Sequence, residues 1–140
     1  MLHIYGEFCS FMSLVQNALN FIIRFRYPGS LPQEIASALG IEIKSTIRFR
    51  KMLDQVIKPH HPPTTLRKFM PREKAEKAFE NALRKEYFGQ NSLFSFYFPE
   101  GWMEFELQFD DTSRLRRLFV HHKLISNPHG YEIPLLIEEN

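Results

Sequence analysis

Two segments with alternating apolar residues constrain the fold of this chain more than any other feature. Every other residue is Phe in segment 94–98, and every other residue is Met, Phe or Leu in segment 103–109. Because side chains alternate between the two faces of a strand, each segment predicts a β-strand with one buried face. The sequence Pro99-Glu100-Gly101-Trp102 between them predicts a turn, so we expect an antiparallel hairpin.

The buried face also predicts the register of this hairpin. Burial of both apolar sets on one face favours a loop of residues 99–102, which pairs Phe98 with Met103 and Phe96 with Phe105. A third strand is expected over residues 114–123. A fourth is expected over 131–137, where Pro134 interrupts it or confines it to a sheet edge.

Apolar residues at helical spacing predict helices before these strands. The first runs from about Ser10 to Arg26, and the second begins after a capping Ser30 and ends at Gly40 in a left-handed conformation. A long amphipathic helix is predicted over residues 71–88, with favourable i,i+4 ion pairs and a stop at Gly89. The fold class is thus α+β: an N-terminal helical region, this long helix, and an antiparallel β-meander of three to four strands.

The length of 140 residues is typical of a single domain, spanning 1–140. The proline-rich loop 58–65 suggests a subdivision into a basic helical half, 1–57, and an α/β-meander half, 66–140. Residues 1–68 hold nine Lys and Arg against four Asp and Glu, whereas residues 69–140 hold nine against twelve. This charge asymmetry suggests a division of labour between the two halves.

Segment 41–57 supports two interpretations. With a period of two, apolar and charged residues alternate from Ile41 to Arg50, which is typical of a strand. With helical spacing, Phe49, Met52 and Val56 lie on one apolar stripe. An extended start followed by a helical end satisfies both patterns.

The segment 31–53 predicts a helix-turn-helix-like corner. Ala36, Gly40 and Ile41 occupy positions that DNA-binding corners of this type require, and the following KSTIRF resembles the start of the recognition helix in winged-helix repressors. The turn is one residue longer than the usual pattern. The resemblance implies contact with DNA through five side chains: Lys44, Ser45, Thr46, Arg48 and Lys51.

A competing prediction places a protein partner on the polar face of the sheet. Trp and Tyr are favoured interface anchors, and acidic residues alternate with the apolar ones beside them. The predicted partner-binding residues are Tyr97, Trp102, Glu104 and Glu106. The protein would then be a protein–protein adaptor or chaperone-like module, and a homodimer is compatible with either prediction.

The remaining sequence patterns argue against disulfide-rich, membrane-spanning and metal-binding classes of protein. The single Cys9 excludes an internal disulfide framework and suits a reducing, cytoplasmic location, while the apolar segment 8–23 is too short to span a membrane comfortably. The pairs His60-His61 and His121-His122 lack metal-site spacing, and adjacent histidines on a strand point to opposite faces. We therefore expect a non-enzymatic binding or regulatory protein with no catalytic residues, no metal, no cofactor, no membrane contact and no small-molecule substrate.

Overall fold

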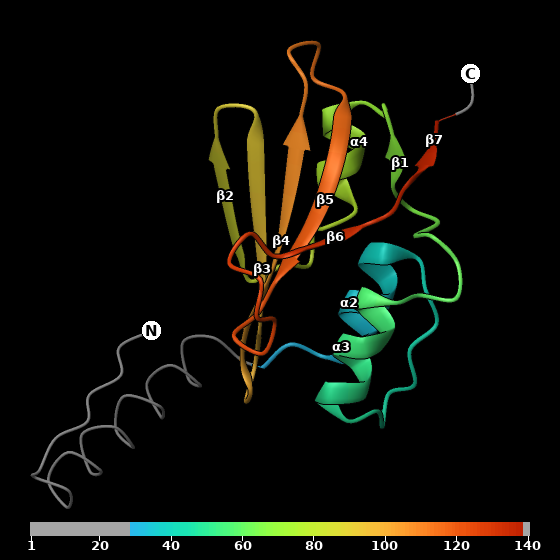
Figure 1. Ribbon diagram of the computed structural model, residues 1–140, viewed down its shortest axis with the longest axis vertical. Coiled ribbons are helices and arrows are strands. Elements are labelled where there is room, and N and C mark those ends of the chain that lie inside the picture. The colour runs from blue at the N-terminus through green and yellow to red at the C-terminus, as the bar shows by residue number, and fades with distance from the viewer. Residues whose placement is uncertain (1–28, 139–140) are drawn as a thin grey trace, which may run out of the picture.

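The computed structural model describes residues 29–138, so the helix predicted over 10–26 lies outside the described residues. The described chain is mixed α+β, as predicted, and is built around a five-stranded antiparallel sheet of order β2-β3-β4-β5-β6 (Figure 1). Its strands are β2 (Arg84–Phe88), β3 (Asn91–Phe98), β4 (Gly101–Phe109), β5 (Leu115–His121) and β6 (Tyr131–Ile133).

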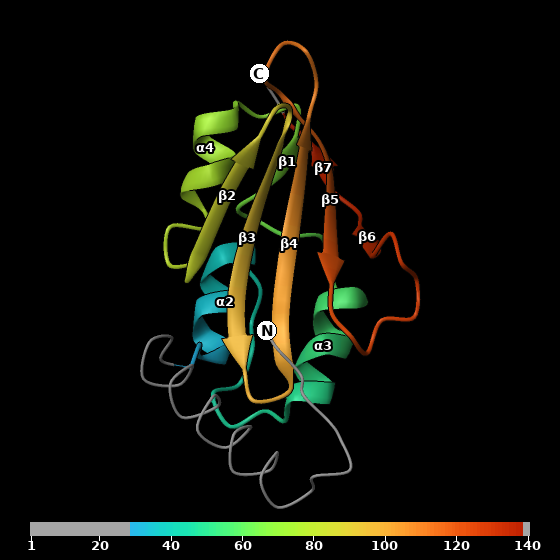
Figure 2. The same ribbon diagram turned by 90° about the vertical axis from the view of Figure 1, so that its left-hand side faces the viewer.

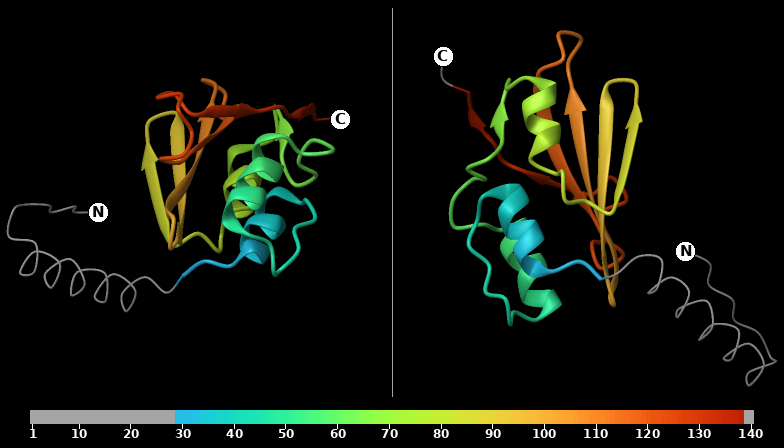
Figure 3. Two further views of the ribbon diagram at one scale, coloured as in Figure 1. Left: turned by 60° about the horizontal axis from the view of Figure 1, so that its bottom comes forward. Right: turned by 180° about the vertical axis from the view of Figure 1, so that it is seen from behind.

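Three helices lie against one face of this sheet: α2 (Pro32–Leu39), α3 (Phe49–Ile57) and α4 (Arg72–Lys77) (Figures 1 and 2). The view from behind in Figure 3 shows α4 in front of part of the sheet and α2 below α4, next to α3. Phe79, in the turn after α4, stacks on Phe94 with ring centroids 5.0 Å apart and also contacts Phe105 at 5.4 Å. The Phe-rich face predicted from the alternation is therefore the face that the helices bury.

The β3–β4 hairpin confirms which residues share a face but not the predicted register. Phe98 pairs with Gly101 and Phe96 with Met103, so the turn consists of Pro99 and Glu100. A shift of two residues leaves every side chain on its original face, so burial alone cannot distinguish the two registers. Gly101, with φ 119°, takes a conformation that L side chains rarely adopt, and this allows the tighter turn.

The long helix predicted over 71–88 is wrong. The helix α4 ends at Lys77, residues 78–83 turn, and residues 84–88 form the edge strand β2 against β3. Ion pairs on an exposed helix contribute only a few tenths of a kcal/mol each, so the backbone hydrogen bonds to β3 decide the conformation. Gly89 still reverses the chain at φ 60°, but it does so in the β2–β3 turn.

The helix α2 begins one residue later than the predicted cap suggests. Leu31 is the N-cap residue, and its N–H donates to Glu34 Oε1 at 2.7 Å. Ser30 instead bonds to β3, since its N–H donates to Tyr97 O at 2.7 Å and its Oγ accepts from Tyr97 N at 3.0 Å. The stop at Gly40 is confirmed, with φ 67° and its N–H bonded to Ala36 O at 2.8 Å.

The predicted fourth strand is divided at Pro134, which has no N–H for a ladder. Before it, β6 pairs with β5; after it, β7 (Leu136–Ile137) leaves the sheet and pairs in parallel with β1 (Arg67–Lys68). Among the described helices, none is long and apolar enough to cross a bilayer.

Candidate functional site

The predicted helix-turn-helix corner does not form between α2 and α3. Residues 41–48 are neither helix nor strand, and the helix begins at Phe49. Ile43 is buried and its carbonyl accepts a hydrogen bond from Gln33 Nε2 at 2.6 Å, which holds this segment along α2. Residues 44–47 then make a turn closed by Ile47 N–H to Lys44 O at 3.0 Å. The strand predicted from Ile41 to Arg50 and the recognition-helix start at Lys44 are therefore wrong, whereas the helical interpretation with Phe49, Met52 and Val56 on one apolar stripe is confirmed.

The five predicted nucleic-acid-binding side chains are nevertheless exposed and follow one another along the surface. Lys44, Ser45 and Thr46 lie in the exposed turn, whereas Arg48 and Lys51 lie at the N-cap and in the first turn of α3. Arg50, which the site prediction omitted, is also exposed beside them. We call Lys44, Arg48, Arg50 and Lys51 the basic α3 surface.

The opposite side of α3 explains why these cations face solvent. Phe49, Met52, Leu53 and Val56 are buried in the core, at the spacing that places them on one stripe. Within residues 29–138 no ion pair joins a residue of the basic α3 surface to an acidic side chain. No described side chain caps the N-terminus of α3, so its first N–H groups add positive potential there.

The four predicted partner-binding residues share the outer face of the sheet, opposite the helices. Tyr97 and Trp102 are cross-strand partners with ring centroids 5.0 Å apart, and the Arg84 guanidinium lies 5.5 Å from the Trp102 ring. Tyr97 is only 6% exposed, which argues against its predicted use as an anchor. Trp102, Glu104 and Glu106 are half-buried.

A cavity of about 500 Å³ lies on the same outer face, further along β4 and β5. At its edge, His121 Nε2 lies 2.9 Å from Glu106 Oε1, while Gln108 Nε2 donates to Glu106 Oε2 at 3.1 Å. Residues 128–129 of the loop before β6 also line it. The sequence pattern predicts Glu106 on this face but did not lead us to the other lining residues: Gln108, Arg117, Phe119, His121 and Glu132. Strand alternation could have grouped Gln108 of β4 with Arg117, Phe119 and His121 of β5, but not with Glu132, which lies in β6.

The side chains of the two adjacent histidines at the end of β5 point to different faces of the sheet, as predicted. His121 is on the outer face, while the buried His122, in the loop after β5, packs against Phe49 of α3. Its Nε2 is 3.1 Å from Glu100 O, and its Nδ1 accepts from Leu124 N–H at 3.0 Å. Burial lowers the pKa of His122. In the described part of the chain, no group of three or more His, Cys, Asp and Glu is placed to hold a metal ion.

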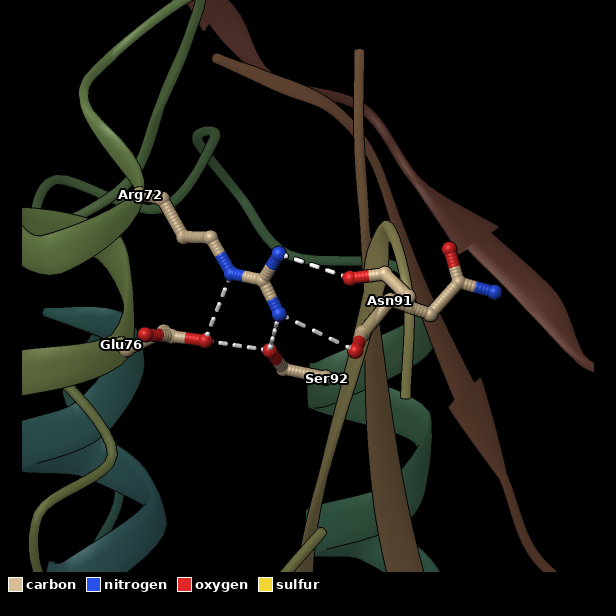
Figure 4. A network of polar contacts seen from close by, with 5 residues as sticks. Arg72, Glu76, Asn91 and Ser92 are labelled. Carbon is tan, nitrogen blue, oxygen red and sulfur yellow. Dashed lines mark hydrogen bonds and ion pairs between the residues drawn. The ribbon is translucent and has the colours of Figure 1, made fainter. Parts of the chain in front are cut away.

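A network of hydrogen bonds around Arg72 holds α4 against the sheet (Figure 4). Arg72 Nε lies 3.0 Å from Glu76 Oε2, and its Nη1 donates to Gly89 O at 2.9 Å. Ser92 Oγ donates to the same Glu76 oxygen, and the guanidinium lies 4.8 Å from the Phe109 ring. This network joins α4 to the start of β3, and each of the three guanidinium nitrogens of Arg72 donates to a protein acceptor.

Comparison with known proteins adds no further assignment: the chain matches no family model, no curated protein and no solved structure.

Proposed function

We propose that this protein is a non-enzymatic binding protein that contacts the phosphates of nucleic acid through the basic α3 surface. One observation carries the proposal: four exposed cations, within residues 44–51, have no acidic partner among the described residues. Such cations can each neutralise a phosphate and release a counterion, which is the main source of affinity for nucleic acid.

The packing and hydrogen bonding beneath these cations also favour binding to nucleic acid. The buried stripe of α3 and the Gln33–Ile43 hydrogen bond hold both parts of the surface in place. Little backbone order then has to be gained on binding, which reduces the free-energy cost of association. Ser45 and Thr46 add exposed hydroxyl groups, which commonly bond to phosphate oxygens.

The geometry favours phosphate contacts over base-specific ones. Base reading in the major groove needs a helix that projects several side chains into the groove, supported by a tight corner. Here residues 40–48 separate the two helices, and the exposed Asp54 follows Arg50 by one turn of α3, where it would repel phosphates. We therefore expect binding with little sequence preference.

The test is fluorescence anisotropy with a labelled DNA duplex of arbitrary sequence at low salt. The double variant Lys44→Ala/Arg48→Ala should lose most of the binding. The matched control is Lys85→Ala/Arg116→Ala, which removes two exposed cations from the sheet instead and should bind as the wild type does. Equal losses in both double variants, or no binding by the wild type, would refute the proposal.

A protein partner at the outer face of the sheet is the second candidate. It is favoured by the half-buried Trp102, whose ring is held between Tyr97 and Arg84 near the end of the hairpin. Tryptophan in such a position is a frequent interface anchor. Trp102→Ala should then weaken self-association or partner association measured by sedimentation while leaving DNA binding unchanged.

A further inference from the structure

The floor of the outer-face cavity is a row of three cross-strand neighbours. Glu106 on β4 pairs with Phe119 on β5, and Phe119 pairs with Glu132 on β6. Neighbouring residues in such a row have Cβ atoms about 5 Å apart and point to the same face. The register therefore places a carboxylate on each side of one aromatic ring, and all three residues line the cavity.

The carboxylate of Glu106 is fixed in position by its neighbours. It receives Gln108 Nε2 at 3.1 Å and Asn91 Nδ2 at 3.5 Å, and it lies 2.9 Å from His121 Nε2. The His121 ring is itself confined, because a Cβ on Gly130 would lie only 2.6 Å from its Cε1. A negative charge is thus held at one side of the cavity without needing to reorganise when a ligand enters.

The carboxylate of Glu132 is held far less firmly. Its only ion-pair partner among the described residues is Arg117, whose Nε lies 3.9 Å away, and both side chains are about half exposed. A pair at this distance in solvent contributes little free energy, so Glu132 can exchange Arg117 for another cation. With neutral histidines, the lining carries two carboxylates against one guanidinium.

We propose that this cavity binds a small organic cation, with an alkylammonium group placed over Phe119 between Glu106 and Glu132. An aromatic face attracts a cation through its quadrupole, and flanking carboxylates add Coulomb attraction and hydrogen-bond acceptors. The volume of about 500 Å³ is typical of a site for a small molecule. The proposal is independent of nucleic-acid contact, since α3 contributes no residue to the cavity.

The test is an NMR titration of the full chain at pH 8, where imidazoles are ordinarily neutral. The probe is Nα-acetyl-lysine methylamide, and the neutral comparison is the same molecule acetylated at Nε. Only the cationic probe should produce saturable shifts at Phe119, Glu132 and Gln108. Saturable binding of the neutral probe with equal affinity, or of Nα-acetyl-glutamate methylamide in its place, would overturn the proposal.

Two variants and one control test whether the cation binds at the row formed by Glu106, Phe119 and Glu132. Glu132→Gln should weaken binding of the lysine probe about threefold, and Phe119→Leu by a similar factor of about three. The control is Glu104→Gln, which removes a carboxylate from the same face of β4 but outside the cavity and should retain the wild-type affinity. If Glu104→Gln weakens binding as much as Glu132→Gln, general surface charge explains the result and the site is refuted.

Discussion

The imidazole ring of His122 lies 4.7 Å from the ring of Phe49, centroid to centroid, and so connects the end of β5 to the first residue of α3. Phe49 also contacts Phe98 at 5.3 Å, which places the start of α3 against the end of β3. The orientation of the basic α3 surface therefore depends on a packing contact made by a titratable side chain.

The first prediction is a stability that falls in mild acid. Because burial lowers the pKa of His122 below its ordinary value of 6.5, the unfolded chain takes up a proton at a pH where the folded protein does not. The contribution of this group is complete above pH 6.5 and is lost as the pH falls toward the lowered pKa, with a slope of at most about 1.4 kcal/mol per pH unit.

This dependence can be measured by urea unfolding between pH 7.5 and pH 5. His122→Gln keeps a donor and an acceptor without the titration, so its free energy of unfolding should change less over this range. His60→Gln, at an exposed position, serves as the control and should follow the wild type. Parallel curves for His122→Gln and the wild type would contradict the prediction.

The second prediction concerns the Arg72 network of Figure 4. Arg72→Ala should lower the free energy of unfolding by about 2–3 kcal/mol, because it removes charge-assisted hydrogen bonds and leaves Glu76 with one fewer partner. Arg84→Ala breaks an equally short pair, with Glu86 at 2.9 Å, but at an exposed site, and should cost less than about 1 kcal/mol. Thermal unfolding of both variants gives the comparison. Equal losses of unfolding free energy would show that the Arg72 network stabilises the protein no more than an exposed ion pair does.

The third prediction separates backbone strain from steric conflict at two glycines. Gly89 has φ 60°, and a Cβ added there would have no neighbouring atom within 4 Å, so Gly89→Ala should cost about 1 kcal/mol from strain alone. Gly40 has φ 67°, but a Cβ there would lie 2.0 Å from Thr64 Oγ1 and 3.0 Å from Thr65 N. Gly40→Ala should therefore cost clearly more than Gly89→Ala in chemical denaturation, and a smaller cost would show that the loop 64–65 is not packed against α2.

The fourth prediction is the salt dependence of DNA binding. Each neutralised phosphate of a duplex contributes about 0.9 to the slope of log affinity against log salt concentration. Lys44→Ala/Arg48→Ala should therefore reduce this slope by about 1.8. An affinity that is lost without a change of slope would indicate that the two residues act through the fold and do not contact phosphate.

Part of the candidate site was predictable because it depends on local periodicity. The apolar stripe of α3 predicts that Arg48, Arg50 and Lys51 face solvent, and strand alternation predicts that Glu104 and Glu106 share a face. The cavity was not predictable, because it needs Glu132 beside Phe119, and that pairing depends on the path of the loop after His121. The helix-turn-helix prediction failed for the same reason: the fit of Ala36 and Gly40 to the pattern says nothing about Ile43, which is buried and is followed by a turn where the pattern predicts a helix.

The amino-acid sequence by itself determined that the alternating apolar residues of 94–98 and 103–109 share a buried face, that Gly40 ends a helix, and that Pro134 interrupts a strand, since each follows from neighbours along the chain. Tertiary structure alone decided that residues 84–88 form a strand, that the hairpin turns at Pro99 and Glu100, and that β7 pairs with β1. The physical reason is that local preferences in these segments differ by a few tenths of a kcal/mol. Hydrogen bonds and packing between segments distant in the chain contribute more free energy than these local preferences and determine the conformation that each segment adopts.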